Sequence, residues 1–492
     1  MTMKKTLLLL AMLGMFVGTQ ATTYYVAPDG SGSSYTLDSP GKFTSTVIGK
    51  LQAGDVLMLR GGQYDLKSNL SISRNGTAEK MILIQAYPGE KPILDFREQA
   101  NGDGNNGLTI KGNYLHIKGL TVRYAGYKGI WLEKAKYCIL EQLDVYGCCN
   151  AGIQLRSGGN NMVINCDSHE NFDYQDDGGN ADGFADKQGD ACPGNIYIGC
   201  RAWGNSDDGW DSYQRVTSGT PTVYINCVAY NNGPATFNLS NHPRVLGKDA
   251  GLSCFSGKDL GNFANGGNPN GFKVGGKGTQ HNVELYRCLA VGHRSKGFDQ
   301  NSNAGLMKII NCTAYKNKYN YGFGNSYNYT LYVYNNIALS HTSGGKDWER
   351  YSGATVYQQH NTWNGDTKPW AATEADFEGL DVTEIIFAER NADGTLPETQ
   401  QFHLKATATH LIDQGLEFTD FSGNEIGNYV SYNGTAPDLG CYEYEGAAGI
   451  GMLTIDEGMP NLTLPRYNLN GQRVDNNYKG IVIQGGKKYI VK

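Results

Sequence analysis

The segment NCTAYKN at residues 311–317 places a cysteine five residues before an asparagine, and this spacing recurs through the middle of the chain. Close copies are NCDSHEN at 165–171, GCRAWGN at 199–205 and NCVAYNN at 226–232; RCLAVGH at 287–293 ends in histidine, and NNIALSH at 335–341 has asparagine in the cysteine position. Where nothing is inserted the repeat is short, since Cys288 and Cys312 are 24 residues apart. Short alternating segments repeated at this period are typical of a parallel β-helix.

The repeated cysteines and asparagines have structural interpretations in such a solenoid. Each coil buries its apolar side only against its neighbours, so the cysteines should stack as small inward-facing residues. We therefore expect most of the 11 cysteines to be free and buried rather than paired in disulfides. The asparagines should form a ladder of side-chain amides that satisfies backbone groups at a bend of each coil.

A second column pairs glycine with a large apolar residue. Its members are Gly129-Ile130, Gly152-Ile153, Gly183-Phe184, Gly209-Trp210, Gly271-Phe272, Gly297-Phe298 and Gly322-Phe323. We expect the apolar residue, Trp210 included, to fill the core, and the residue after it to point outward because side chains alternate along a strand. The outward residues of successive coils are then Ala185, Asp211, Lys273, Asp299 and Gly324. Since adjacent coils are about 4.8 Å apart, Asp211 and Lys273 should be neighbours on one outer face.

The two ends of the chain differ from the repeats. Residues 1–21, MTMKKTLLLLAMLGMFVGTQA, join two lysines to an apolar run too short to cross a bilayer, which predicts a signal peptide and a secreted protein without a membrane span. Residues 22–446 should form the β-helix, and their opening resembles that of secreted β-helix enzymes, in which a short helix, here at about 43–51, caps the first coil. Residues 447–492 resemble the small β-rich tails that some exported proteins carry for sorting or attachment.

Charge and loop lengths narrow the choice of partner. The net charge of −6 argues against a nucleic-acid partner, because phosphate binding needs a basic face. An acidic substrate would have to be bound by local cationic side chains rather than attracted by the net charge of the whole protein. We expect the protein to be a monomer. Two inserted segments, DYQDDGGNA at 173–181 and residues 233–268, are of the kind that builds a binding cleft on a rigid scaffold.

An acidic patch is predicted where two adjacent coils meet. The stretch NSDDGWDSY at 205–213 contains Asp207, Asp208 and Asp211, and Asp182 occupies the position before glycine that Asp208 occupies one coil later. Four carboxylates this close raise one another's pKa values unless a cation compensates them. An all-oxygen, carboxylate-rich site without histidine or cysteine favours calcium over zinc. The simpler interpretation is a solvated acidic turn.

Four motifs resemble those of polysaccharide lyase family 9: NADGFADK at 180–187, NSDDGWDSY at 205–213, NGFKVGG at 270–276 and KGFDQN at 296–301. The resemblance covers about residues 22–445, and it implies a right-handed parallel β-helix that binds Ca²⁺ and cleaves pectin, an acidic plant cell-wall polysaccharide, by β-elimination. The implied calcium ligands are Asp182, Asp207, Asp208 and Asp211. The implied Brønsted base is Lys273.

This chemistry makes a specific demand on Lys273. The reaction removes the C5 proton of galacturonate and expels the oxygen on C4, so the base must be a neutral amine with a lowered pKa. Asp211 and Asp299 flank Lys273 and favour the ammonium form; we expect calcium to take up the charge of Asp211, and Asp299 to lean away or bind substrate hydroxyls. Arg294 and Lys296, one coil further on, are either carboxylate-binding residues of another subsite or solvated surface charges.

Two other functional classes remain open. A β-helix hydrolase of the polygalacturonase type would also use paired aspartates, but it would need a histidine-containing motif that is not found in this sequence. A non-enzymatic, calcium-stabilised carbohydrate-binding solenoid would leave Lys273 without a role. Homogalacturonan and rhamnogalacturonan I both offer a galacturonate with a leaving C4 oxygen, so these residues do not choose between the two backbones, nor between endo and exo action.

Overall fold

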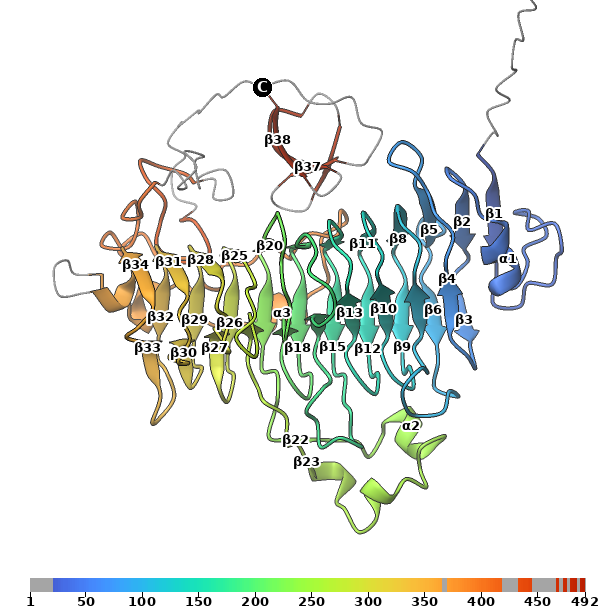
Figure 1. Cartoon of the computed structure of the whole chain (residues 1–492), viewed down its shortest axis with the longest axis horizontal. Helices are drawn as coiled ribbons and strands as arrows, with labels where there is room; N and C mark the ends of the chain where they lie inside the picture. Colours follow the sequence, from blue (N-terminus) through green and yellow to red (C-terminus); the bar gives the residue numbers. More distant parts are fainter. Residues whose placement is uncertain are drawn as a thin grey trace, which may run out of the picture.

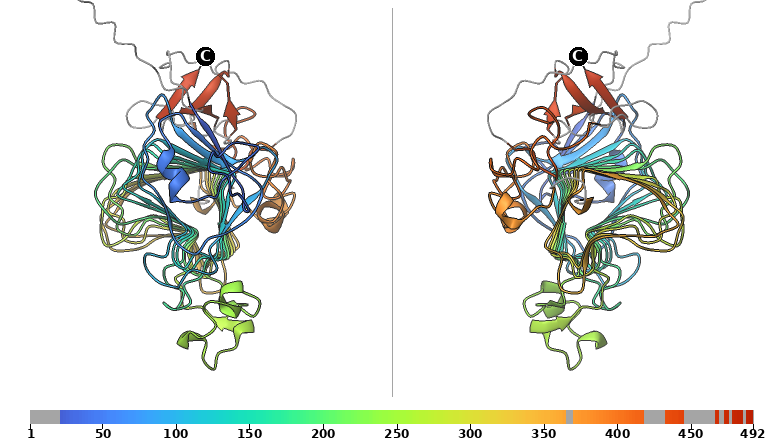
Figure 2. Two further views of the ribbon diagram at one scale, coloured as in Figure 1. Left: turned by 90° about the vertical axis from the view of Figure 1, so that its right-hand side faces the viewer. Right: turned by 90° about the vertical axis from the view of Figure 1, so that its left-hand side faces the viewer.

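The computed structural model describes residues 21–364, 370–417, 432–444, 466–468, 472–475, 478–484 and 487–491. Within them the chain winds into three long parallel sheets, in which each strand pairs with the equivalent strand of the next coil (Figure 1). Viewed along the long axis, the coils superpose around a common interior (Figure 2). The predicted parallel β-helix is therefore confirmed. The predicted signal peptide, apart from residue 21, lies outside the described residues.

Each coil contributes strands to the three sheets in turn. Sheet 1 has the order β1 (Thr23–Val26), β2 (Val56–Leu59), β5 (Ile82–Ala86), β8 (Leu115–Lys118), β11 (Ile139–Glu141), β14 (Met162–Ile164), β17 (Ile196–Ile198), β20 (Thr222–Ile225), β25 (Val283–Tyr286), β28 (Leu306–Ile310), β31 (Thr330–Tyr334) and β34 (Thr355–Gln359). Sheet 2 has the order β3 (Gly62–Asp65), β6 (Pro92–Asp95), β9 (Thr121–Arg123), β12 (Asp144–Tyr146), β15 (Asp167–His169), β18 (Arg201–Trp203), β21 (Val228–Tyr230), β26 (Leu289–Val291), β29 (Thr313–Tyr315) and β32 (Ile337–Leu339). Sheet 3 has the order β4 (Leu70–Ile72), β7 (Leu108–Ile110), β10 (Ile130–Glu133), β13 (Ile153–Arg156), β16 (Phe184–Asp186), β19 (Trp210–Asp211), β24 (Phe272–Lys273), β27 (Lys296–Asp299), β30 (Tyr319–Phe323) and β33 (Lys346–Arg350).

The remaining elements lie at the ends and on the outside of the solenoid. They are the helices α1 (Ser45–Lys50), α2 (Pro243–Leu246) and α3 (Thr383–Ile386), the 3₁₀ turns η1 (Ser253–Phe255), η2 (Leu260–Asn262), η3 (Thr362–Asn364) and η4 (Glu374–Asp376), the pair β22 (Thr236–Phe237) and β23 (Phe263–Ala264), and an antiparallel sheet of β35 (Arg466–Tyr467), β36 (Arg473–Val474), β37 (Gly480–Gln484) and β38 (Lys487–Val491). Helix α1 buries Val47 and Ile48 in the main core, in agreement with the helix expected at about 43–51. No helix in the described part of the chain has the length and apolar character needed to cross a membrane.

The cysteine and asparagine columns are found where the repeats place them. All 11 cysteines are free, and Cys166, Cys200 and Cys227 are fully buried in the core. In the neighbouring column the Asn171 amide donates to Asn205 Oδ1 at 2.8 Å, and the Asn205 amide donates to the next asparagine oxygen at 2.8 Å. These buried amides satisfy one another along the axis, which rigidifies the bend of each coil.

The interior of sheet 3 is a column of stacked aromatic rings. Phe184, Trp210, Phe272, Phe298 and Tyr321 follow one another with centroid separations of 4.8, 4.6, 5.2 and 4.9 Å. The prediction that Trp210 fills the core is therefore confirmed, since its exposed fraction is 1%.

The end of this column differs from the sequence-based alignment. Phe298 pairs with Tyr321 rather than Phe323, so Asp299 lies opposite Gly322 and not Gly324, and the predicted register was wrong by two residues. The cause is Asn320, whose side-chain oxygen accepts the Asn317 amide and thereby takes the place of a ladder residue. The Tyr321 hydroxyl is satisfied inside the core by donating to the Cys312 carbonyl at 2.9 Å.

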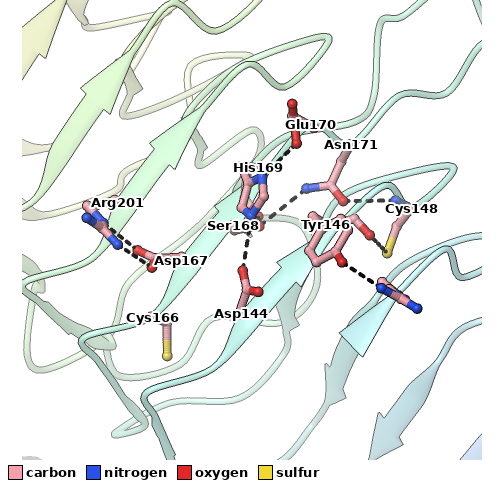
Figure 3. A network of polar contacts seen from close by, with 12 residues as sticks. Asp144, Tyr146, Cys148, Cys166, Asp167, Ser168, His169, Glu170, Asn171 and Arg201 are labelled. Atoms are coloured by element: carbon pink, nitrogen blue, oxygen red, sulfur yellow. Dashed lines mark hydrogen bonds and ion pairs between the residues drawn. The ribbon is translucent and has the colours of Figure 1, made fainter. Parts of the chain in front are cut away.

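After β34 the described chain returns along the outside of sheet 2. Apolar residues of this returning segment, such as Ile385 and Phe402, pack with Val228 and Leu289 of the sheet. Asp167 is held by two arginines at 2.6 Å each, Arg201 from the adjacent strand and Arg390 from the returning segment. The Arg201 contact is visible in Figure 3.

A histidine of sheet 2 lies between aromatic rings and carboxylates; Figure 3 shows its contacts with Asp144 and Glu170. The His169 ring stacks on Trp203 at 4.0 Å and on Tyr146 at 5.0 Å, and its nitrogens approach Asp144 at 3.0 Å and Glu170 at 3.1 Å. Burial alone would lower the pKa of His169, but the two carboxylates outweigh it and raise the pKa to about 9. The imidazolium form is thus the one that the fold prefers.

This predicts a pH-dependent contribution to stability. Because the pKa of His169 rises from 6.5 to about 9 on folding, its contribution is fully present below pH 6.5 and is lost as the pH rises through 9. The difference in unfolding free energy between wild type and His169→Ala, measured by urea denaturation, should shrink across this window. His341→Ala, at an exposed ion pair, is the control and should show little change. A constant difference for His169→Ala would contradict the prediction.

Candidate active site on the outer face of sheet 3

Three adjacent strands of sheet 3 bring the predicted site residues together. Strand β19 pairs with β16 on one side and with β24 on the other, and Asp211 lies directly opposite Lys273 in the register. The prediction that these two residues are neighbours is therefore confirmed, although they are 62 positions apart in the sequence. The coils approach so closely here that a Cβ atom on Gly209 would lie 2.6 Å from the Gly271 carbonyl oxygen. The same close approach explains why glycine follows Asp182 and Asp208 in their coils.

Three of the four predicted metal ligands form one compact group. One carboxylate oxygen each from Asp182, Asp208 and Asp211 lies within 4.8 Å of the others, and all three residues have exposed fractions of 2% or less. Asp182 and Asp208 both precede the glycine of their coil, as expected. The group is buried, so the alternative of a solvated acidic turn does not describe it.

Asp207 has a different immediate environment. Its Oδ1 accepts a hydrogen bond of 2.7 Å from the backbone N–H of Asn268, at the end of the inserted segment. Burial and the nearby Asp208 carboxylate raise the pKa of Asp207 well above its usual range. Asp207 therefore belongs to the same electrostatic cluster while it also anchors the insertion, and its role as a metal ligand stays a prediction.

Two lysines, not one, compensate the carboxylates. The Lys273 amine lies 2.8 Å from Asp208 and 3.5 Å from Asp211. The Lys187 amine lies 2.7 Å from Asp182 and 2.8 Å from Asp211. Sequence reasoning gave no role to Lys187, although it closes the motif NADGFADK.

The pKa values show that this compensation is incomplete. Burial raises the pKa of Asp208 to about 8 and that of Asp182 to about 6. For Asp211 burial acts in the same direction, but the two ammonium groups outweigh it and lower its pKa. Buried oxygen donors with excess negative charge are what a divalent hard cation requires, so the residues fit a calcium ion.

The same carboxylates act on Lys273. Burial alone would lower the pKa of Lys273, but Asp208 and Asp211 outweigh it and raise the pKa well above its usual value. In the metal-free protein Lys273 is thus an ammonium group, whereas the sequence analysis required a lowered pKa. The other flanking residue, Asp299, accepts a bond of 2.7 Å from Lys296 on its own strand, so its charge is already partly compensated.

The other predicted substrate-binding residues lie beside the cluster. Arg294 is exposed and donates to the carbonyl oxygen of Gly233, where the insertion begins. Lys296 is half-buried, and its amine is bound to Asp299 and, at 3.3 Å, to Asn325. Both are cationic and close to the coil of Lys273, but Lys296 already has a carboxylate partner.

The inserted segment contributes residues that sequence reasoning missed. Asn270 occupies the position before glycine, and both its backbone N–H and its side-chain amide donate to Asp208 Oδ1, at 3.0 and 2.7 Å. Asn265 donates to the Ser206 carbonyl at 2.8 Å. Asn270 follows the inserted segment, and its sequence signals are its place in the same column as Asp182 and Asp208 and its position at the start of the motif NGFKVGG.

The chain is similar to several known proteins over most of its length. The family described as Pel9A-like, right-handed β-helix region, matches residues 24–336. Pectate lyase L of Dickeya dadantii is 34% identical over 433 residues, covering 85% of this chain and 90% of the relative. Pectate lyase PEL9 of Emericella nidulans is 30% identical over 416 residues, covering 81% of this chain and 95% of the relative.

Two solved structures have the same fold. The crystal structure of pectate lyase Pel9A superposes with a TM-score of 0.71 at 32% identity, covering 87% of this chain and 98% of the other. A rhamnogalacturonan lyase superposes with a TM-score of 0.63 at 24% identity, covering 79% of this chain and 97% of the other. The second likeness concerns the fold alone.

The ion pairs of Lys187 predict its contribution to stability. Lys187→Ala should lower the unfolding free energy by about 3–5 kcal/mol, because Asp182 and Asp211 would each lose a buried partner. The measurement is urea denaturation in the presence of a chelator. Lys346→Ala, at an exposed pair, is the matched control and should change stability by less than about 1 kcal/mol. Equal effects of the two substitutions would refute this role of Lys187.

Proposed function

The chain belongs to the Pel9A-like right-handed β-helix family of polysaccharide lyases and is a pectin-degrading lyase. We propose that it is secreted, depends on calcium and uses Lys273 as its base. The observation that carries the proposal is the placement of a lysine amine 2.8 Å from a buried cluster of carboxylates on one face of the solenoid. The predicted signal peptide at 1–21 supports secretion.

We assign the calcium site to Asp182, Asp207, Asp208 and Asp211. Support comes from the three oxygens within 4.8 Å, the purely oxygen donor set and the raised pKa values of Asp208 and Asp182. When bound, calcium would supply positive charge that neutralises these carboxylates and polarises the carboxylate of the galacturonate. Lys187 would remain an ammonium group, since it already holds Asp182 and Asp211 in place.

The reaction assigned to Lys273 is removal of the C5 proton. The neutral amine forms an N–H bond with that proton, the C5–H electron pair becomes the C4–C5 double bond, and the C4–O bond breaks with its pair on the departing oxygen. The product carries a 4,5-unsaturated uronide. The residue is 8% exposed, and its amine lies beside Asp208 and Asp211 on the outer face of the sheet. If calcium neutralised the charges of Asp208 and Asp211, the pKa of Lys273 would fall and the neutral amine would become available as a base.

The relatives also bear on the backbone that is cleaved. Those at 30% identity or more are named pectate lyases, which favours homogalacturonan as the substrate. Rhamnogalacturonan I remains the second candidate, because it contains the same galacturonate chemistry. Arg294 and Lys296 are assigned to carboxylate binding at a neighbouring subsite, for which Arg294 offers a guanidinium at the surface.

Substitution of the base tests the assignment. Lys273→Ala should reduce turnover of de-esterified homogalacturonan by about 10³-fold, because positioned general bases contribute rate factors of that order. The measurement is the ultraviolet absorbance of the unsaturated uronide, with rhamnogalacturonan I as a parallel substrate. Lys277→Ala, an exposed lysine on the same coil, is the control. Release of shorter sugars without ultraviolet absorbance would indicate a hydrolase. If Lys273→Ala bound and processed the polysaccharide as the wild type does, the protein would be a binding solenoid.

The effect of calcium on stability tests the metal site independently of turnover. Saturating calcium at about 100-fold above its dissociation constant should stabilise the fold by about 2.7 kcal/mol, measured as a shift of the denaturation midpoint. Asp208→Asn should abolish most of this shift, while Asp190→Asn, at an exposed carboxylate on a neighbouring coil, should preserve it. Calcium binding that persists in Asp208→Asn would place the ion elsewhere.

A further inference from the structure

The outer face of sheet 3 continues beyond the acidic cluster toward the N-terminal coils. The pairing register aligns Trp131 of β10 with Gln154 of β13, then with Ala185, Asp211 and finally Lys273. With strands about 4.8 Å apart, Trp131 lies roughly 14 Å from Asp211 and roughly 19 Å from Lys273 along one straight row. A polysaccharide chain lying along the axis over the cluster would also pass over Trp131.

Lys128, just before β10, differs from the other buried lysines of this protein. Its exposed fraction is 9%, yet its amine forms no hydrogen bond or ion pair with any described residue. By contrast, Lys187, Lys273 and Lys308 all lie within 3 Å of a carboxylate. A buried cation without a hydrogen-bonding or anionic partner is costly. Burial accordingly lowers the pKa of Lys128 to about 7.

Aromatic rings surround this amine. It lies over the Tyr127 ring at 3.5 Å and near the Trp131 ring at 5.6 Å, and both rings are half-buried. Next along the row, Gln154 is 4% exposed, and its side-chain amide likewise has no hydrogen bond to a described residue. The face therefore combines a cation, a free amide and ring surfaces, which is the composition of a site for a carboxylated sugar.

The backbone around Lys128 is held in place by buried polar residues. The Gln99 side-chain oxygen accepts from the Gly126 N–H at 3.0 Å, and the Asn106 side-chain oxygen accepts from the Lys128 N–H at 3.3 Å. The Gln99 amide in turn donates to the Asn106 carbonyl at 2.9 Å. Because these supports are 1–2% exposed, the segment is preorganised rather than a flexible surface turn.

We propose that Tyr127, Lys128 and Trp131 form a distal subsite that binds the carboxylate and ring of a galacturonate in the same polysaccharide chain that is cleaved at Lys273. This inference rests on the proposed function. An extended pyranose unit is about as long as one strand spacing, so the subsite lies about four sugar units from the base. It would make the enzyme favour substrates long enough to span both places.

The test is binding and turnover as a function of chain length. The ligands are galacturonate trisaccharide and octasaccharide, and rhamnogalacturonan octasaccharide. Lys128→Met, which keeps the apolar stem, should weaken binding of an octasaccharide to the Lys273→Ala protein by about tenfold, the size of one charge-assisted bond, and leave the trisaccharide unchanged. In the active protein it should raise KM for the octasaccharide with kcat nearly unchanged. Lys136→Met, an exposed lysine on the same coil, is the control.

Each outcome decides one question. A loss confined to long ligands supports the subsite, and the octasaccharide that shows it identifies the backbone. No loss with either octasaccharide, or an equal loss with the trisaccharide, overturns the subsite even if wild-type activity is normal. Absence of wild-type lyase activity on both polymers would instead refute the proposed function. Calorimetric binding of the octasaccharides to the Lys273→Ala protein, with and without Lys128→Met, would still test the role of Lys128.

Discussion

The structure depends on the in-register hydrogen bonding of each coil to the next. Parallel pairing with a constant spacing turns sequence positions far apart into neighbours along straight rows. Asp211 and Lys273 meet because β19 and β24 pair residue for residue across a long insertion. The cysteine stack, the asparagine ladder and the aromatic column are the interior consequences of the same register, and they make the outer rows rigid enough to hold charged groups at fixed separations.

The rows concentrate charge that the fold alone does not balance. Burial raises the pKa values of Asp182 and Asp208, while Lys187 and Lys273 hold their ammonium forms against the same burial. The excess negative charge of this site favours a bound cation. In the proposed mechanism a calcium ion there would lower the pKa of Lys273, because Asp208 and Asp211 now raise it. In this proposed mechanism, metal binding and base activation would be coupled through Asp208 and Asp211, which contact Lys273 directly.

The additions to the solenoid serve this face in different ways. The insertion between β21 and β24 projects from the solenoid (Figure 1), and its end returns to bind Asp207 and Asp208 through Asn268 and Asn270. The segment after β34 covers sheet 2 instead, where the Asp167 ion pairs fasten it. The proposed active site lies on sheet 3, where the acidic cluster and Trp131 share one row and Lys128 lies just before β10.

The repeats were enough to predict the parallel β-helix, the free cysteines, the core position of Trp210 and the proximity of Asp182, Asp208, Asp211 and Lys273. These follow from periodicity, because a repeated coil converts spacing along the chain into position on a face. The structure was needed to show that Tyr321, not Phe323, continues the aromatic column, that Lys187 shares the carboxylates, and that the buried Lys128 amine contacts aromatic rings but no carboxylate among the described residues. Such features depend on which side chains compete for the same neighbour in space, and a local pattern of residues carries no information about that competition.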